Sequence, residues 1–277
     1  MKRIINRQPN ARVQVLLSLL PFITAVVIYI IASEARLAVN ADDKLLPSLD
    51  VMFKSLTRLA TEPNKRTGDI LLWTDTAASL SRLAWGVSIS ALLGLFFGIL
   101  SGAIPYAKSL LSSFIAVLSM IPPMAILPIL FIMFGLGELS KVVLIVIGIA
   151  PFIIRDLQQQ VLEIPREQII KAQTLGASTW QIIYRVLLPQ LYPRLIQAVR
   201  LSLGSAWLFL IAAEAIAATD GLGYRIFLVR RYLAMDVILP YVAWITLLSY
   251  LADTALLKLS RHISPWFHGT QRKEPSA

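Results

Sequence analysis

The sequence has no cysteine, few charged residues and only two histidines, and each shortage excludes a class of chemistry. Without cysteine, the 277-residue chain has no disulfide, no thiolate metal site and no cysteine nucleophile. Both histidines, His262 and His268, lie near the C-terminus and outside the apolar runs, which excludes a histidine-centred site within those runs. Charged residues make up 15% of the chain and hydrophobic residues 57%, which leaves too little charge for the surface of a water-soluble enzyme.

What the chain does contain is a series of apolar runs separated by polar segments. A helix needs about 20 apolar residues to cross the hydrocarbon core of a bilayer. Six segments meet or approach this length, namely 13–33, 82–102, about 110–134, about 139–154, about 195–218 and about 237–259. We therefore predict an all-α, polytopic transmembrane bundle of about six spans. The first run is too long for the apolar core of a cleaved signal peptide, which is the alternative interpretation, so we expect an uncleaved span.

An even number of spans places both termini on the same side of the membrane, and the distribution of Lys and Arg assigns that side to the cytoplasm. The predicted organisation has five parts. The parts are a cytoplasmic N-terminus (1–12), a first transmembrane helix (13–33), a periplasmic or surface segment with amphipathic helices (34–81), a core transmembrane domain (82–262) and a cytoplasmic tail (263–277). The net charge of +10 is explained by this topology and by anionic lipid. Nucleic-acid binding is not expected, because the basic residues form no stripe with interleaved aromatics.

Small residues recur every fourth position along the second run. They are Gly86, Ser90, Gly94, Gly98 and Gly102. Such spacing lets two helix backbones approach closely where lipid removes the hydrophobic drive for association. We predict that this stripe is a helix-packing face.

Prolines interrupt the third run at Pro122 and Pro123. Irregular backbone at membrane depth must be buried in protein or line a cavity, so we place the substrate pathway near these two residues. Trp207 and Glu214 in the fifth run are further candidates for the pathway. Packing is the alternative role for Trp207. The alternative role for Glu214 is structural, as a hydrogen-bond acceptor for the backbone groups that the prolines of the third run leave unpaired.

The polar stretch 163–193 predicts two short amphipathic helices joined by a glycine turn. Pro165 suits the first turn of a helix, and Gly176 suits the C′ position, where a positive φ costs glycine nothing. Ser178 with Gln181 three residues later forms a capping box for the second helix. Pro189 is expected to stop that helix. The unit is too small for a domain, and it is either a hairpin on the membrane surface or a knob that docks into a groove of another protein.

The segment KAQTLGASTWQIIYRVLLP, within 163–193, resembles the EAA loop of ABC-importer permeases. Four residues match the pattern at the positions that would couple to an ATPase: Ala172, Gly176, Leu188 and Pro189. The sequence departs from it at Ile170, which replaces the acidic residue, and at Lys171, which replaces the first alanine; Glu167 lies one turn earlier. The segments IPPMAILPILFIMFGLGELSK and LFLIAAEAIAATDGLGYRI extend the resemblance to permeases of the nitrate, taurine, aliphatic sulfonate and bicarbonate type.

This resemblance implies a type I importer-like permease with a cytoplasmic coupling helix, in the inner membrane of a bacterium. It implies three protein partners, which are an ABC ATPase subunit, a periplasmic solute-binding protein and a second permease copy, besides the membrane lipid. The chain has no Gly-x-x-x-x-Gly-Lys loop, so we expect no cofactor and no enzymatic activity in this subunit, and ATP on the partner ATPase. No metal site is expected. A stand-alone secondary transporter and a membrane-embedded enzyme remain as alternatives.

Overall fold

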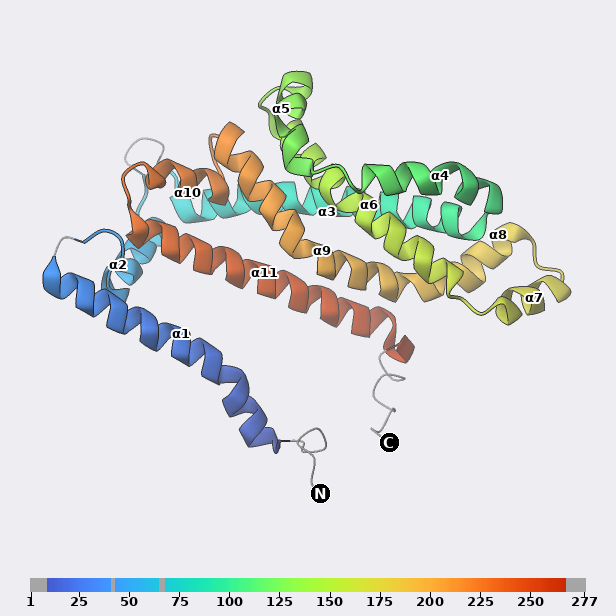
Figure 1. The fold of residues 1–277 in the computed structure, drawn as a ribbon, viewed down its shortest axis with the longest axis horizontal. Helices are drawn as coiled ribbons and strands as arrows, with labels where there is room; N and C mark the ends of the chain where they lie inside the picture. Colours follow the sequence, from blue (N-terminus) through green and yellow to red (C-terminus); the bar gives the residue numbers. More distant parts are fainter. Residues whose placement is uncertain (1–8, 41–42, 65–67, 268–277) are drawn as a thin grey trace.

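The computed structural model describes residues 9–40, 43–64 and 68–267, and within them the chain forms helices and no β-strand (Figure 1). The predicted all-α class is confirmed. The helices in chain order are α1 (Ala11–Val39), α2 (Leu49–Thr61), α3 (Leu71–Ala103), α4 (Pro105–Leu118), α5 (Pro123–Phe134), α6 (Glu138–Leu162), α7 (Arg166–Thr174), α8 (Thr179–Ile182), the π-helix η2 (Ile183–Leu187), α9 (Leu188–Ala217), α10 (Leu222–Arg230) and α11 (Met235–Ile263). Most of the predicted termini 1–12 and 263–277 lies outside the described residues.

Four helical segments of the described chain are long and apolar enough to cross a membrane, and the bent pair of α4 and α5 is a fifth candidate. The four are Arg12–Val39, Leu71–Ala103, Thr179–Ala217 and Met235–Ile263. By length and composition, the described helices thus supply four or five of the about six predicted spans. The remaining predicted span, 139–154, lies within α6, the central helix of the core, whose apolar middle has charged residues on both sides.

Helix α3 begins earlier than predicted. The segment 70–80 was expected to lie on the membrane surface, with a span starting at Arg82, but Leu71–Ala103 is one continuous helix. The expectation began the span at Arg82 because the segment before it is polar and mixed. Asp75, Ser79 and Arg82 are buried instead, on the face of α3 that meets other polar groups of the chain.

The small-residue stripe of α3 lies against α6. A Cβ built on Gly86 would lie 2.8 Å from the Cβ of Ile145, and one built on Gly94 would lie 2.4 Å from Cγ2 of Ile153. Gly98 and Gly102 meet Leu157 and Val161 in the same way, one turn further along each time. The fifth member of the stripe, Ser90, is fully buried, and its hydroxyl donates to the carbonyl of Gly86. The two helices thus lie backbone to backbone along most of their length (Figure 1).

The third apolar run is not one span but two helices. α4 ends at Leu118, α5 begins at Pro123, and their axes differ by 94°. Pro122 has extended backbone and Pro123 occupies the first turn of α5, where its missing N–H leaves no hydrogen bond unmade. Two consecutive prolines therefore redirect the chain between α4 and α5. α5 then ends at Phe134, and Gly135 follows with a φ of +75°.

The predicted stop at Pro189 was also wrong. The helical segment that starts at Thr179 continues without interruption to Ala217. A π-turn, Ile183–Leu187, precedes the proline, which has no N–H to donate to the carbonyl of Arg185. Widening the helix by one residue accommodates the proline, so α8, the π-turn and α9 form one continuous helical segment.

Candidate functional site

A buried cluster of charged residues ties the α9–α10 turn to α3 and α6. Arg82 of α3 is 4% exposed and forms ion pairs with Glu214 of α9, Glu138 of α6 and Asp220 in the turn. The distance from its Nη1 to Oε1 of Glu214 is 2.8 Å, and Nη1 also donates to the carbonyl of Asp220 at 3.0 Å. The Nζ of Lys141 reaches the same Glu138 at 2.8 Å. One guanidinium thus joins three segments that are far apart in sequence.

The turn itself is held through its backbone. Three consecutive amides, of Gly221, Leu222 and Gly223, donate to Asp75, Ser79 and Glu214 at 2.9–3.0 Å. Gly221 has a φ of +114°, and a Cβ there would lie 2.6 Å from the Glu214 carboxylate. Only glycine permits this approach, because it tolerates the conformation and leaves room for the carboxylate.

A second carboxylate extends the cluster. Asp75 is fully buried, and it accepts hydrogen bonds from Arg225 of α10 at 2.8 Å and from the hydroxyl of Tyr241 of α11 at 3.2 Å. At the edge of the cluster, Glu138 is 63% exposed and precedes the apolar part of α6. Hydrogen bonds from Arg82 and Lys141 lower the pKa of Glu138 to about 2, so this carboxylate is charged at any physiological pH.

Glu214, a candidate for the pathway, has the structural role instead. It is fully buried and accepts hydrogen bonds from Ser79, Arg82 and the amide of Gly223. A carboxylate enclosed by its own chain does not line an open path. Its partners also differ from the expected ones, because none of them belongs to the backbone around Pro122 and Pro123. The four residues predicted for the substrate pathway therefore do not meet at Glu214.

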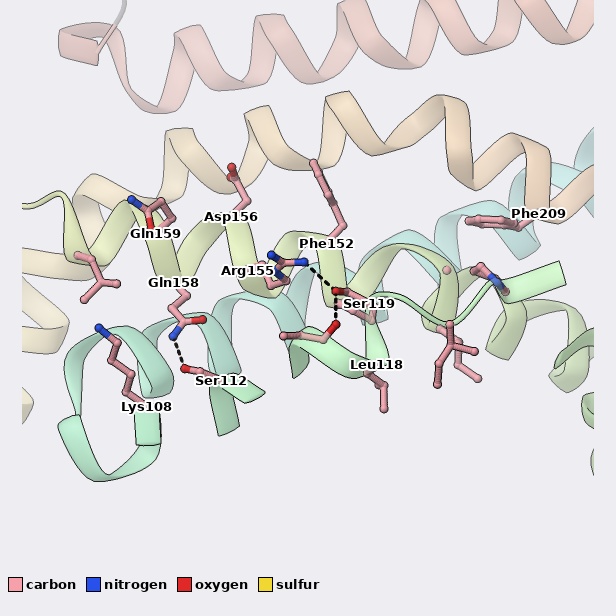
Figure 2. A pocket seen from close by; sticks show the side chains of 17 residues that line it. Lys108, Ser112, Leu118, Ser119, Phe152, Arg155, Asp156, Gln158, Gln159 and Phe209 are labelled. Carbon is pink, nitrogen blue, oxygen red and sulfur yellow. Dashed lines mark hydrogen bonds between the residues drawn. The ribbon is translucent and has the colours of Figure 1, made fainter. Parts of the chain in front are cut away.

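A cavity of about 740 Å³ lies at the break between α4 and α5, bounded by α4, α6 and Phe209 of α9. Pro123 lines it, whereas Pro122 does not. Its polar lining comes from α4 and α6: Lys108, Ser112, Ser119, Arg155, Asp156, Gln158 and Gln159 (Figure 2). Two hydrogen bonds cross it, from Arg155 Nη1 to Ser119 Oγ at 2.8 Å and from Gln158 Nε2 to Ser112 Oγ at 2.7 Å. This cavity is the candidate site for a solute.

Trp207, the fourth residue predicted for the pathway, does not line this cavity. It is 4% exposed and lies beside a separate groove between α9 and α11. Its indole Nε1 is the one buried side-chain nitrogen or oxygen without a partner among the described residues. The same groove contains the ion pair of Arg200 and Asp253, whose Nε and Oδ1 are 2.8 Å apart.

The stretch 163–193 forms an elbow, which we define as α7, the Gly176 turn and α8. The elbow projects from one end of the bundle (Figure 1). The structure confirms the positive φ of Gly176, which is +81°, and the capping box of Ser178 and Gln181. The amide of Ala177 donates to the carbonyl of Ala172 and the amide of Gly176 to that of Gln173, at 3.0 and 2.9 Å. This is a Schellman motif, so Ala172 and Gly176 shape the same turn.

The other two residues predicted to couple to an ATPase lie where the elbow joins α9. Leu188 packs partly against the core, and Pro189 is exposed directly after the π-turn. A hydrogen bond from Gln190 to Gln168, at 3.1 Å, connects α9 back to α7. Ile170, at the position of the expected acid, is 55% exposed on α7. The contacts of these residues lie within the chain, and their role in coupling stays a prediction.

Sequence reasoning missed the ionic partners of Glu214 and the polar lining of the cavity. Arg82 and Asp75 are seven residues apart, two helical turns, so they share one face of α3, and this spacing could have marked them as an inward polar face. No sequence signal pairs Arg155 with Ser119, because their contact depends on the 94° bend between α4 and α5. Nor does the sequence show that Phe209 packs over Gly148.

An all-helical membrane bundle with a broken helix, a polar cavity at the break and a projecting elbow defines a transport permease. Comparison with known proteins agrees. Residues 91–268 match the family of binding-protein-dependent transport system inner membrane components, and the chain belongs to this family. It is therefore a permease component of a binding-protein-dependent ABC importer.

Two relatives and one solved structure illustrate the similarity. The taurine transport system permease protein TauC of Escherichia coli is 37% identical over 201 residues, which is 73% of each chain. The putative aliphatic sulfonates transport permease protein SsuC of Escherichia coli is 30% identical over 203 residues, 73% of this chain and 77% of the relative. A chain of the MetNI methionine ABC transporter in an inward-facing conformation superposes with a TM-score of 0.58 at 22% identity, covering 78% of this chain and 99% of the other. That structure supports the fold.

Proposed function

We propose that this permease translocates a small polar solute of the taurine, sulfonate or bicarbonate type, powered by ATP that a separate subunit binds and hydrolyses. A solute-binding protein delivers the solute on the periplasmic side, and two copies of the chain form the path in the inner membrane. The chain itself binds no nucleotide and performs no catalysis. The named transport systems of its relatives, TauC and SsuC, support the choice of solute class.

The observation that carries the ATPase partnership is the uncovered apolar surface of the elbow. Leu175 is 81% exposed, Trp180 is 76% exposed and Tyr184, in the π-turn that follows, is 71% exposed. Polar residues surround them, including Lys171, Gln173 and Gln181, so this end of the molecule is unsuited to the hydrocarbon core. Large apolar side chains in a polar setting mark a protein interface. A helix-in-groove contact with the ATPase would bury them.

The same end of the bundle is assigned to the cytoplasm. The first turn of α1 and the last turn of α11 lie toward the elbow end (Figure 1). The last turn of α11 carries Arg261, and the basic residues Arg166, Lys171 and Arg185 lie in the elbow and the π-turn after it. Basic residues near the ends of spans favour the cytoplasmic side. Both termini then share a compartment with the ATPase.

Gly176→Val is expected to abolish ATP-driven uptake while leaving a correctly inserted permease. The backbone at Gly176 has a φ of +81°, which a β-branched residue resists, although a Cβ there would meet no atom within 4 Å. The defect is therefore one of turn geometry alone. Uptake and ATP hydrolysis by the reconstituted transporter measure it. Gly176→Asn is the matched control, because asparagine tolerates this conformation, and it should keep most of the activity.

A crosslink tests the partnership directly. With the single cysteine of Trp180→Cys as the only thiol in the chain, a short thiol-to-amine reagent is expected to join the permease to the co-purified ATPase. Cysteine at Lys54 on α2, at the opposite end of the bundle (Figure 1), serves as the control and should give no such product. If the Lys54→Cys variant gave the ATPase adduct and Trp180→Cys did not, both the elbow as the contact surface and the orientation would be wrong.

A further inference from the structure

The cavity at the α4–α5 break has a cationic wall. Arg155 and Lys108 both line it, and among the described residues neither has a carboxylate within ion-pair distance. Arg155 uses one N–H on Ser119, which leaves the rest of its guanidinium donors for other acceptors. Both cations are exposed, so their charges face the open cavity and favour an anionic ligand there.

The one carboxylate at the cavity points away from this wall. Figure 2 shows Asp156 directed toward α9, on the opposite side of α6 from Ser112 and Ser119. Its electrostatic partners there are Arg194 of α9 and Glu163. Because consecutive residues of a helix point in different directions, Arg155 faces the cavity whereas Asp156 lies beside α9. The field within the cavity is positive.

The opposite part of the cavity is apolar. Ile121 and Pro123 at the helix break, Ile147 of α6 and Phe209 of α9 line it. The Phe209 ring lies so close to Gly148 that a Cβ there would be 2.3 Å from it, which fixes the ring as one wall of the cavity. Phe152 adds a second ring, 51% exposed. A cavity with a cationic end and an apolar end matches a molecule with one charged group and a short carbon chain.

We propose that this cavity is a binding site for a short-chain organic oxyanion of sulfonate chemistry. Arg155 and Lys108 hold the charged oxygens, with Ser119 positioning the guanidinium, and Phe152 and Phe209 contact the carbon chain. The inference rests on the proposed function, because it places the transported solute inside the permease. At about 740 Å³, the cavity has room for such a solute together with water.

Binding of radiolabelled ethanesulfonate to the complete transporter in phosphatidylcholine nanodiscs tests the site. The wild-type complex is expected to bind saturably, and Arg155→Gln should weaken binding about tenfold or more, since it removes a charge-assisted contact. Arg58→Gln is the matched control, because Arg58 is exposed on α2 and far from the cavity in the sequence and in the fold (Figure 1). It should bind like the wild type.

A second variant tests the apolar end without disturbing the core. Phe152 is half exposed, so Phe152→Ala should fold normally. The wild type should bind butanesulfonate more tightly than methanesulfonate, and Phe152→Ala should reduce this preference about threefold or more, because it removes apolar contact area. An unchanged preference, or wild-type binding by Arg155→Gln, would overturn the proposed site.

A lipid headgroup is the other source of an oxyanion. If ethanesulfonate fails to bind in phosphatidylcholine, and Arg155→Gln instead lowers the amount of phosphatidylglycerol that co-purifies, the site belongs to lipid and the proposal is wrong. ATP hydrolysis in the same samples separates this failure from that of the proposed function. Arg58 lies outside both the cavity and the elbow, so Arg58→Gln should keep the hydrolysis of the wild-type complex. If ATP hydrolysis by the wild-type complex were not coupled to transport, the proposed function would be refuted, whereas the binding measurement would still test the site.

Discussion

Arg82→Gln is expected to destabilise the folded permease by about 3–5 kcal/mol, because it leaves the Glu214 carboxylate buried without a cation. The carboxylate would keep its hydrogen bonds from Ser79 and the amide of Gly223, but these are neutral donors. The turn that follows α9 would also lose the bond to the carbonyl of Asp220. The thermal unfolding midpoint of the purified permease in detergent measures the loss.

Two further variants separate lost charge balance from lost packing. The double variant Arg82→Gln with Glu214→Gln removes both buried charges and should recover a large part of the stability, because an uncompensated charge costs more than a missing pair. Lys54→Gln breaks an ion pair with Asp50 whose side chains are 73% and 68% exposed, and it should change stability by less than about 0.5 kcal/mol. A double variant no more stable than Arg82→Gln alone would contradict the buried-charge explanation.

Patterns that depend on neighbouring residues were predicted correctly from the sequence. The turn at Gly176, the capping box of Ser178 and the break at Pro122 and Pro123 each depend on backbone preferences within a few positions. The structure reproduces all three. The apolar runs likewise predicted helices, because a membrane-spanning backbone must satisfy its hydrogen bonds internally.

The errors arise where a partner that is distant in the sequence changes the free-energy cost of placing a residue inside the helix bundle. The second span was expected to begin at Arg82, and the sequence did not show that Glu214 and Asp220 pair with this arginine from more than a hundred residues away. Pro189 looked like a helix stop, but the π-turn before it absorbs the defect. The sequence pointed to the region of Pro122 and Pro123, and Pro123 lines the cavity, yet the cationic wall depends on the bend between α4 and α5, which local patterns do not contain.

Gly94→Ala is expected to lower the free energy of unfolding by about 1–3 kcal/mol, because the added methyl group overpacks the contact between α3 and α6. The new Cβ would lie 2.4 Å from Cγ2 of Ile153 and 3.1 Å from its Cβ, both atoms of a buried, β-branched side chain with one favoured rotamer in a helix. The side chain cannot turn aside, so α3 and α6 must separate locally. Because α6 also lines the cavity, uptake should fall together with the thermal unfolding midpoint.

The rescue and the control both follow from the same contacts. Ile153→Ala removes the atom at 2.4 Å, so Gly94→Ala combined with Ile153→Ala should be more stable than the sum of the two single changes, a coupling of about 0.5–3 kcal/mol. Gly204→Ala places the same methyl group on α9 where no atom lies within 4 Å, and it should be neutral or stabilising because alanine favours helix. Equal losses at Gly94 and Gly204 would mean that helix propensity or lipid contact decides the outcome, and that the stripe on α3 is not the surface against which α6 packs.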